Sequence, residues 1–182
     1  QSRLDPVAYR GPLLHRVLEQ LLADAYWGAL DFLLIDLPPG TGDIAISLGQ
    51  LIPNSEILVV TNPALAASEV AQRAGRLAHQ MKQRIIGVVE NMSYLLCPKC
   101  GEAQKIFGQG GGLASAKALS ELTNADIPLL ASIPFEVELR DGGDNGQPLA
   151  PSNSPTYKAL DELAGILTLR SDTLVGRSLP LA

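Results

Sequence analysis

Four short apolar runs alternate with segments of helical periodicity, and this alternation constrains the fold more than any other feature of the chain. The runs cover residues 31–36, 57–61, 85–89 and 128–133. Nearly continuous runs of this length are typical of parallel strands buried on both faces. Helices are predicted around them, over residues 12–25, 43–51, 62–81, 113–122, 135–140 and 154–167. The sequence therefore predicts an α/β fold, an open and mostly parallel sheet with helices on both faces.

Composition narrows the possible partners. A net charge of −5 and a pI near 5.0 argue against a broad electrostatic grip on nucleic acid or on an anionic membrane. No apolar run approaches the roughly 18 residues that span a bilayer, and the start of the chain lacks a secretory signal. We expect a cytoplasmic protein that binds neither nucleic acid nor membrane.

Both cysteines of the chain lie in one motif, Cys97-Pro98-Lys99-Cys100. Thiolate sites for zinc and the common iron–sulfur clusters take about four protein ligands, so this motif is half a site. The missing ligands come most simply from a second copy, which predicts a homodimer. Free thiols or a thioredoxin-like pair are alternatives, but a redox pair should open a helix directly after a strand. Here Pro98 and Gly101 shape a knuckle, so metal is favoured.

The string DLPPGTGD at residues 36–43 is the second signal. An aspartate that ends an apolar strand, as Asp36 is predicted to do, is where nucleotide hydrolases hold the water shell of Mg²⁺. A glycine a few residues later, Gly40, lets a backbone N–H approach a terminal phosphate. The alternative is a strand end with a proline-rich turn, and the full string favours the switch loop.

Asn91 follows the third apolar run, and its amide has both a donor and an acceptor, which suits the edge of adenine. Taken alone, an ordinary turn asparagine is the better interpretation. Asp36, Asn91 and the segment after Pro134 all follow predicted strand ends, so we expect them to converge on one rim of the sheet. The glycine-rich residues 108–112 lack the context of a phosphate loop and are predicted to be a flexible hinge.

Taken together, these segments resemble the Mrp/Nbp35 (ApbC) family of iron–sulfur cluster carrier ATPases, in the MinD/ParA-like group of P-loop NTPases. The resemblance covers roughly residues 9 to 165. The matching stretches are residues 9–12, 31–43, 60–63, 87–93, 97–101, 107–112, 133–135 and 140–148.

The resemblance implies a nucleotide site for ATP and Mg²⁺. Asp36 would hold Mg²⁺ through water, and Gly40 would sense the γ-phosphate. Asn91 would recognise adenine, while Pro134 and Phe135 would line the base pocket.

The resemblance also implies that Cys97 and Cys100 bind a [4Fe–4S] cluster bridged between two subunits. The protein would transfer this cluster to apo iron–sulfur proteins, with ATP binding or hydrolysis regulating the transfer. Two alternatives remain: an ATP-switched spatial regulator of the MinD/ParA kind, and a structural dimer stapled by zinc.

Two departures from the family pattern stand out. The expected Thr-Thr-Pro-Gln is here Thr61-Asn62-Pro63-Ala64, and no Walker A loop occurs in the 182 residues. The chain, which begins with Gln1, therefore resembles the C-terminal portion of a P-loop ATPase that lacks its P-loop strand. We expect ATP hydrolysis from the complete protein but not from this chain alone. A missing central strand should also leave apolar surface and unpaired ladder groups exposed.

The expected domain organisation is simple. Residues 1–168 are predicted to form a partial P-loop NTPase domain, with the cysteine motif in an insertion at residues 92–109. Residues 169–182 are predicted to form a disordered tail.

Overall fold

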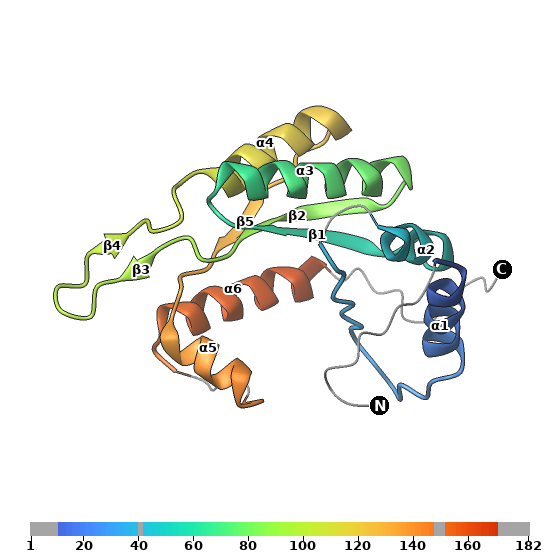
Figure 1. The fold of residues 1–182 in the computed structure, drawn as a ribbon, viewed down its shortest axis with the longest axis horizontal. Coiled ribbons are helices and arrows are strands. Elements are labelled where there is room, and N and C mark those ends of the chain that lie inside the picture. The colour runs from blue at the N-terminus through green and yellow to red at the C-terminus, as the bar shows by residue number, and fades with distance from the viewer. Residues whose placement is uncertain (1–10, 40–41, 148–151, 171–182) are drawn as a thin grey trace.

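The fold is built on a three-stranded parallel sheet (Figure 1). The computed structural model describes residues 11–39, 42–147 and 152–170, so Gly40 and residues 171–182 of the predicted tail lie outside the described residues. The sheet has the order β1 (Glu56–Thr61), β2 (Arg84–Glu90), β5 (Leu129–Ser132). The predicted runs at 57–61, 85–89 and 128–133 are confirmed as strands.

Strand β2 is the middle strand, and its sequence reflects that position. It pairs with β1 from Glu56 opposite Arg84 to Thr61 opposite Glu90, and with β5 on its other edge. Every residue of β2 after Arg84 is buried. A strand covered on both faces and paired on both edges needs the near-continuous apolar run that the sequence has here.

Helices cover both faces of the sheet, as predicted. Helices α3 (Leu65–Gln80) and α4 (Gly111–Thr123) pack side by side on one face, and α6 (Pro155–Arg170) packs on the other (Figure 1). Helix α1 (Gly11–Ala23) contacts α2 (Asp43–Leu51), and α5 (Val137–Asp144) follows β5.

Two hydrophobic clusters hold these layers together. Val88, Leu119 and Ala71 belong to the cluster between the sheet and helices α3 and α4. Val89 and Leu163 belong to the smaller cluster between the sheet and α6. Because alternate side chains of a strand point to opposite faces, Val88 and Val89 anchor different layers.

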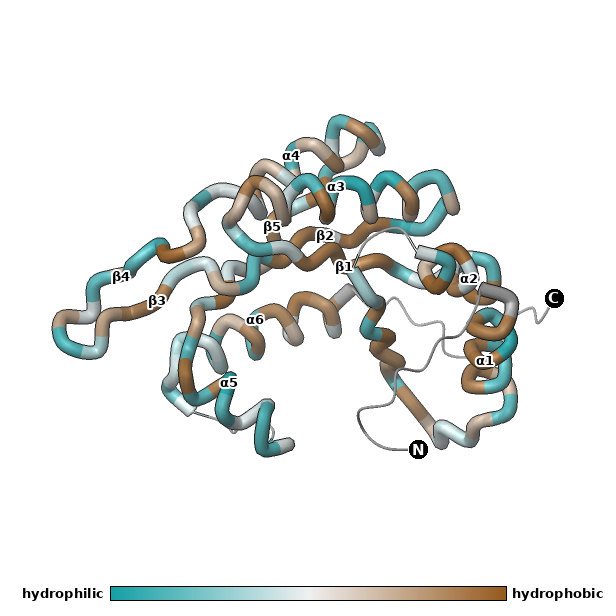
Figure 2. The backbone as a smooth tube through the Cα atoms, in the orientation of Figure 1, coloured by the Kyte–Doolittle hydropathy of each residue, from teal (hydrophilic) through white to brown (hydrophobic). Residues whose placement is uncertain are grey.

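The prediction of a buried strand at residues 31–36 is wrong. The segment is extended but pairs with no strand of the described chain, and its apolar side chains are exposed, Leu34 by 88%. Figure 2 shows it as a hydrophobic stretch apart from the sheet. A strand needs a neighbour for its backbone groups, and β1 pairs only with β2 among the described residues. Val60 on β1 is also exposed, so the expected exposure of apolar surface is observed.

Among the described residues, none of the helices is long and apolar enough to cross a membrane.

The packing predicts that substituting two leucines of the same helix lowers the free energy of unfolding by very different amounts. Leu119 of α4 is 1% exposed and belongs to the core, whereas Leu113 of α4 is 63% exposed. Leu119→Ala should lower the free energy of unfolding by about 2–5 kcal/mol, because it removes apolar contacts and leaves a cavity. Leu113→Ala should stay within about 0.5 kcal/mol of the parent chain. Urea denaturation followed by circular dichroism measures both, and equal losses would contradict this packing.

Candidate functional site

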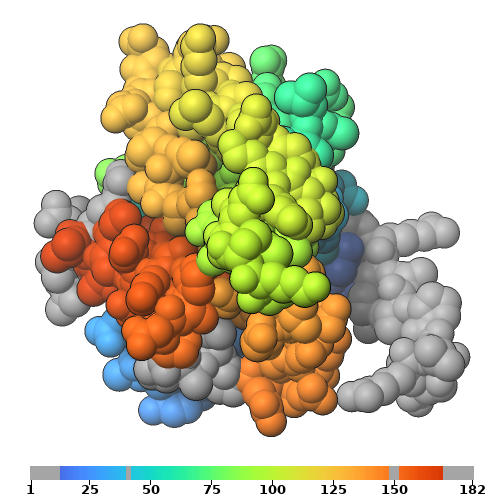
Figure 3. Space-filling model, turned by 90° about the vertical axis from the view of Figure 1, so that its left-hand side faces the viewer, coloured from blue at the N-terminus to red at the C-terminus, as the bar shows by residue number. Residues whose placement is uncertain are grey.

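The cysteines lie at the end of a two-stranded hairpin. Strands β3 (Leu95–Leu96) and β4 (Ala103–Gln104) pair antiparallel and form this hairpin. The hairpin follows directly from the carboxyl end of β2 and projects from the body of the protein (Figure 1). Viewed from the left-hand side of Figure 1, the hairpin lies in front of α4, α5 and α6 (Figure 3).

The turn that carries the cysteines is held by backbone hydrogen bonds. The N–H of Cys97 donates to the Glu102 carbonyl at 2.9 Å, and the N–H of Gly101 donates to the Cys97 carbonyl at 2.8 Å. Gly101 has φ +74°, which favours glycine. These contacts form the predicted knuckle, with Cys97 half-buried and Cys100 exposed, both as free thiols.

The knuckle favours the thiolate form of Cys97. The backbone N–H groups of Lys99 and Cys100, followed by the Cys100 side chain, hydrogen-bond to Cys97 and lower the pKa of its thiol. Hydrogen bonds to a charged form stabilise that form. Thiolates, rather than thiols, bind metals, so the turn favours the form of Cys97 that a metal would require.

The described part of the chain brings no further cluster of metal-ligating side chains to the two cysteines. Within residues 11–39, 42–147 and 152–170, no group of three or more His, Cys, Asp or Glu could hold a metal ion. The two cysteines therefore stand as a pair of ligands without a third from the described part of their own chain. This agrees with the ligand count made from the sequence.

The predicted adenine-site residues lie on two neighbouring segments at the rim. The N–H of Phe135 donates to the Tyr94 carbonyl at 2.8 Å, and the N–H of Asn91 donates to the Thr61 carbonyl at 2.8 Å. The Asn91 Oδ1 accepts from the N–H of Met92. Pro134 is fully buried, whereas Phe135 is half-buried.

Asp36 is not brought to this rim by a strand. Its carboxylate is exposed and makes no hydrogen bond or ion pair to the described residues, because the segment 31–36 does not join the sheet. The expected convergence is therefore observed for Asn91 and the segment at Pro134, but not for Asp36. Gly40, the predicted phosphate sensor, lies outside the described residues.

The prediction of a flexible hinge at residues 108–112 is wrong for Gly111 and Gly112, which are buried. A Cβ on Gly111 would lie 2.5 Å from the Asn62 carbonyl oxygen and 2.7 Å from that of Pro63, and one on Gly112 would lie 2.7 Å from the Glu90 Cβ. Gly108 and Gly110 have φ of +94° and +83°. Gly111 therefore allows close packing against backbone and Gly112 close packing against the Glu90 side chain, while Gly108 and Gly110 adopt a backbone conformation that favours glycine.

A buried carboxylate that was not predicted from the sequence lies at the same place. Glu90, the last residue of β2, is 7% exposed and accepts hydrogen bonds from Ser93 Oγ and from the N–H of Gly112. A charged residue at the end of an otherwise apolar run was the signal that could have found it.

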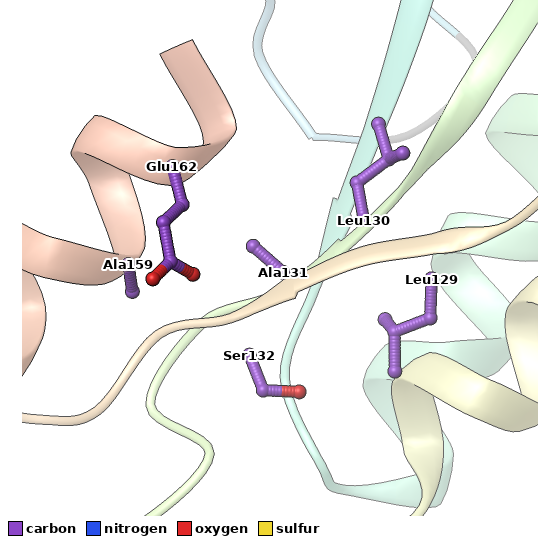
Figure 4. Close-up of a pocket in the computed structure, with 6 residues that line it drawn as sticks. All are labelled: Leu129, Leu130, Ala131, Ser132, Ala159 and Glu162. Atoms are coloured by element: carbon purple, nitrogen blue, oxygen red, sulfur yellow. The ribbon is translucent and has the colours of Figure 1, made fainter. Parts of the chain in front are cut away.

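A surface cavity of about 260 Å³ lies between β5 and α6 (Figure 4). The Glu162 side chain points from α6 toward β5, near Ala131. The cavity contains none of the predicted site residues; it is lined by Leu129, Leu130, Ala131, Ser132, Ala159 and Glu162.

Solved structures share this fold. A nucleotide-binding protein in complex with ADP from Archaeoglobus fulgidus superposes with a TM-score of 0.61 at 33% identity, over 74% of this chain and 53% of that one. The cell division ATPase MinD of Pyrococcus furiosus superposes with a TM-score of 0.58 at 25% identity, over 88% of this chain and 59% of that one. The open parallel sheet with helices on both faces thus defines a MinD-like α/β protein of the P-loop NTPase class.

Sequence relatives narrow the class to a family. Residues 1–168 match the ParA family described as NUBPL iron-transfer P-loop NTPase. The iron–sulfur cluster carrier protein of Mycobacterium tuberculosis is 56% identical over 178 residues, which cover 97% of this chain and 46% of that protein. The carrier protein of Synechocystis is 40% identical over 87% of this chain and 44% of its own length. The chain belongs to this iron-transfer P-loop NTPase family, and it spans about half the length of these curated relatives.

The knuckle predicts an unusual alkylation profile for Cys97. The pKa of Cys97 is lowered in the folded protein. In metal-free protein, Cys97 should therefore react with iodoacetamide at pH values below the pKa of an ordinary thiol, which is about 8.5. Unfolding in urea removes the N–H donors, so the midpoint of the pH dependence of the alkylation rate should rise. Trypsin cleaves after Lys99 and separates the two cysteines, so mass spectrometry reads each one. A Cys97 midpoint that is the same in folded and unfolded chain would contradict the prediction.

Proposed function

We propose that the protein carries an iron–sulfur cluster on Cys97 and Cys100 and passes it to apo iron–sulfur proteins. The observation that carries this proposal is a thiol pair on a projecting knuckle whose backbone N–H groups favour the Cys97 thiolate. Membership of an iron-transfer family, and relatives named iron–sulfur cluster carrier proteins, support the choice of cargo.

The ligand count supports a [4Fe–4S] cluster shared by two copies. Such clusters take four thiolates, and the described part of one chain offers two. Because the hairpin projects from the body of the protein (Figure 1) and lies at the front of the face seen in Figure 3, a second hairpin can approach it. An exposed Cys100 also leaves the cargo within reach of the thiols of a recipient protein.

The nucleotide half of the proposal concerns the complete protein. ATP with Mg²⁺ would regulate transfer, with Asp36 and Gly40 on the phosphate side and Asn91, Pro134 and Phe135 on the base side. The residues fit in part: Asp36 is exposed, and no hydrogen bond among the described residues engages the side-chain Nδ2 of Asn91. The ADP-bound relative supports a nucleotide site in this fold.

The cargo proposal predicts a reconstitution result. Incubating the complete protein anaerobically with iron and sulfide should produce an iron–sulfur absorption band, one cluster per two chains, together with a shift to dimer in analytical ultracentrifugation. Cys97→Ser/Cys100→Ser should give neither, because the ligands are gone. Lys99→Ala, between the cysteines, keeps both thiols and should behave as wild type.

Two results would overturn the cargo proposal. A band of equal intensity in the double variant would place the cluster elsewhere. Stoichiometric zinc in the purified protein, with no gain of iron, would favour the zinc-stapled dimer, because four cysteines serve both metals.

The nucleotide proposal predicts that Asp36→Ala in the complete protein reduces Mg²⁺-dependent ATP hydrolysis to background, since the carboxylate would hold the water shell of the metal. Cluster reconstitution should survive, because the cysteines lie on a separate hairpin. Asp31→Ala is the matched control: Asp31 is an exposed aspartate of the same segment. A phosphate-release assay measures all three proteins, and unchanged hydrolysis in Asp36→Ala would remove Asp36 from this role.

A further inference from the structure

We propose that Glu90 is a positioning residue that holds both ends of the cysteine hairpin on the rim of the sheet. The hairpin leaves the sheet after Glu90 and returns at Gly110, where α4 begins. The carboxylate of Glu90 contacts both ends. Its effect on cluster binding rests on the proposed function, whereas its effect on the hairpin does not.

The outgoing end is tied through Ser93. Ser93 Oγ lies 2.9 Å from Glu90 Oε1 and 2.9 Å from the Glu90 carbonyl oxygen, and Ser93 is itself buried. The N–H of Ser93 donates to the Ile133 carbonyl at 2.9 Å. The first residues of the hairpin are therefore fixed both to the carboxylate and to the segment after β5.

The returning end is tied through Gly112. Its N–H donates to Glu90 Oε2 at 2.7 Å. This N–H belongs to the first turn of α4, where unpaired donors and the helix dipole favour a negative charge. The contact requires a glycine, because a Cβ on Gly112 would lie 2.7 Å from the Glu90 Cβ and 3.0 Å from Oε2.

The two oxygens of Glu90 thus face two donors from opposite ends of an 18-residue insertion, 92–109. Only a carboxylate of this length offers two acceptors at once. In Glu90→Gln one oxygen can still accept from the Gly112 N–H, and the NH₂ group can donate to Ser93 Oγ while the Ser93 hydroxyl donates to the carbonyl of residue 90. The substitution therefore replaces two hydrogen bonds to a carboxylate by neutral hydrogen bonds, which are roughly half as strong.

Glu90 also connects the hairpin to the predicted base site. Asn91 is the next residue, and its N–H is bonded to the Thr61 carbonyl, while the N–H of Ile133 donates to the Glu90 carbonyl at 2.8 Å. A shift of this strand end would therefore move Asn91 and the hairpin ends together.

Hydrogen exchange followed by mass spectrometry tests the proposal in the metal-free complete protein. In Glu90→Gln, amides of residues 92–112 should exchange about tenfold faster or more, while amides of β1, of residues 84–89 and of α3 keep their wild-type rates. Glu102→Gln is the matched control, since Glu102 is an exposed glutamate of the same hairpin; it should leave all rates unchanged. Ser93→Ala keeps the carboxylate, removes only the outgoing contact, and should accelerate the hairpin amides by a smaller factor.

Unchanged exchange at residues 92–112 in both Glu90→Gln and Ser93→Ala would overturn the proposal. So would an acceleration spread equally over β1, β2 and α3, which would show general destabilisation. If Glu90→Gln does not fold, Ser93→Ala decides between the same outcomes. Loss of a reconstituted cluster to a chelator should also be faster in Glu90→Gln than in Glu102→Gln. Failure of the wild type to take up a cluster would overturn the proposed function but not the exchange result.

Discussion

The pairing of β2 on both of its edges is the constraint on which the rest of this structure depends. Its ladder to β1 and its ladder to β5 place three strand ends at one rim. Its alternating side chains anchor helices on opposite faces, through Val88 on one and Val89 on the other. Because the cysteine hairpin continues directly from β2, the strand that is paired on both edges also carries the projecting element.

The rim combines a buried carboxylate with a run of glycines, and each of these features would destabilise the fold without the other. A buried carboxylate is unfavourable unless its oxygens are hydrogen-bonded, and Glu90 has a donor at each oxygen. A run of glycines weakens a chain unless its conformation requires them, and here Gly111 and Gly112 let α4 begin against the Asn62 carbonyl and against Glu90. Each feature explains the other: the glycines allow the approach, and the carboxylate accepts the N–H that the approach brings.

Most of the fold and part of the candidate site could be predicted from the sequence. The apolar runs at 57–61 and 85–89 became strands because their neighbours lie within the described chain. The similar run at 31–36 did not, because no strand of the described chain stands beside it. An apolar pattern indicates which segments are suited to burial, but it does not show whether a partner strand is present to bury them. The glycine run was misinterpreted for a related reason, since its packing partners at Asn62 and Glu90 are distant in sequence.

By itself, the sequence determined the helices, the paired strands and the cysteine knuckle with its two thiols, because these follow from local periodicity and local chemistry. Only the tertiary structure decided that Glu90 is buried between Ser93 and Gly112, and that Asn91 lies beside the segment at Pro134 while Asp36 does not join them. Those relations depend on hydrogen bonds between segments far apart in the chain, and residue order alone does not specify such contacts.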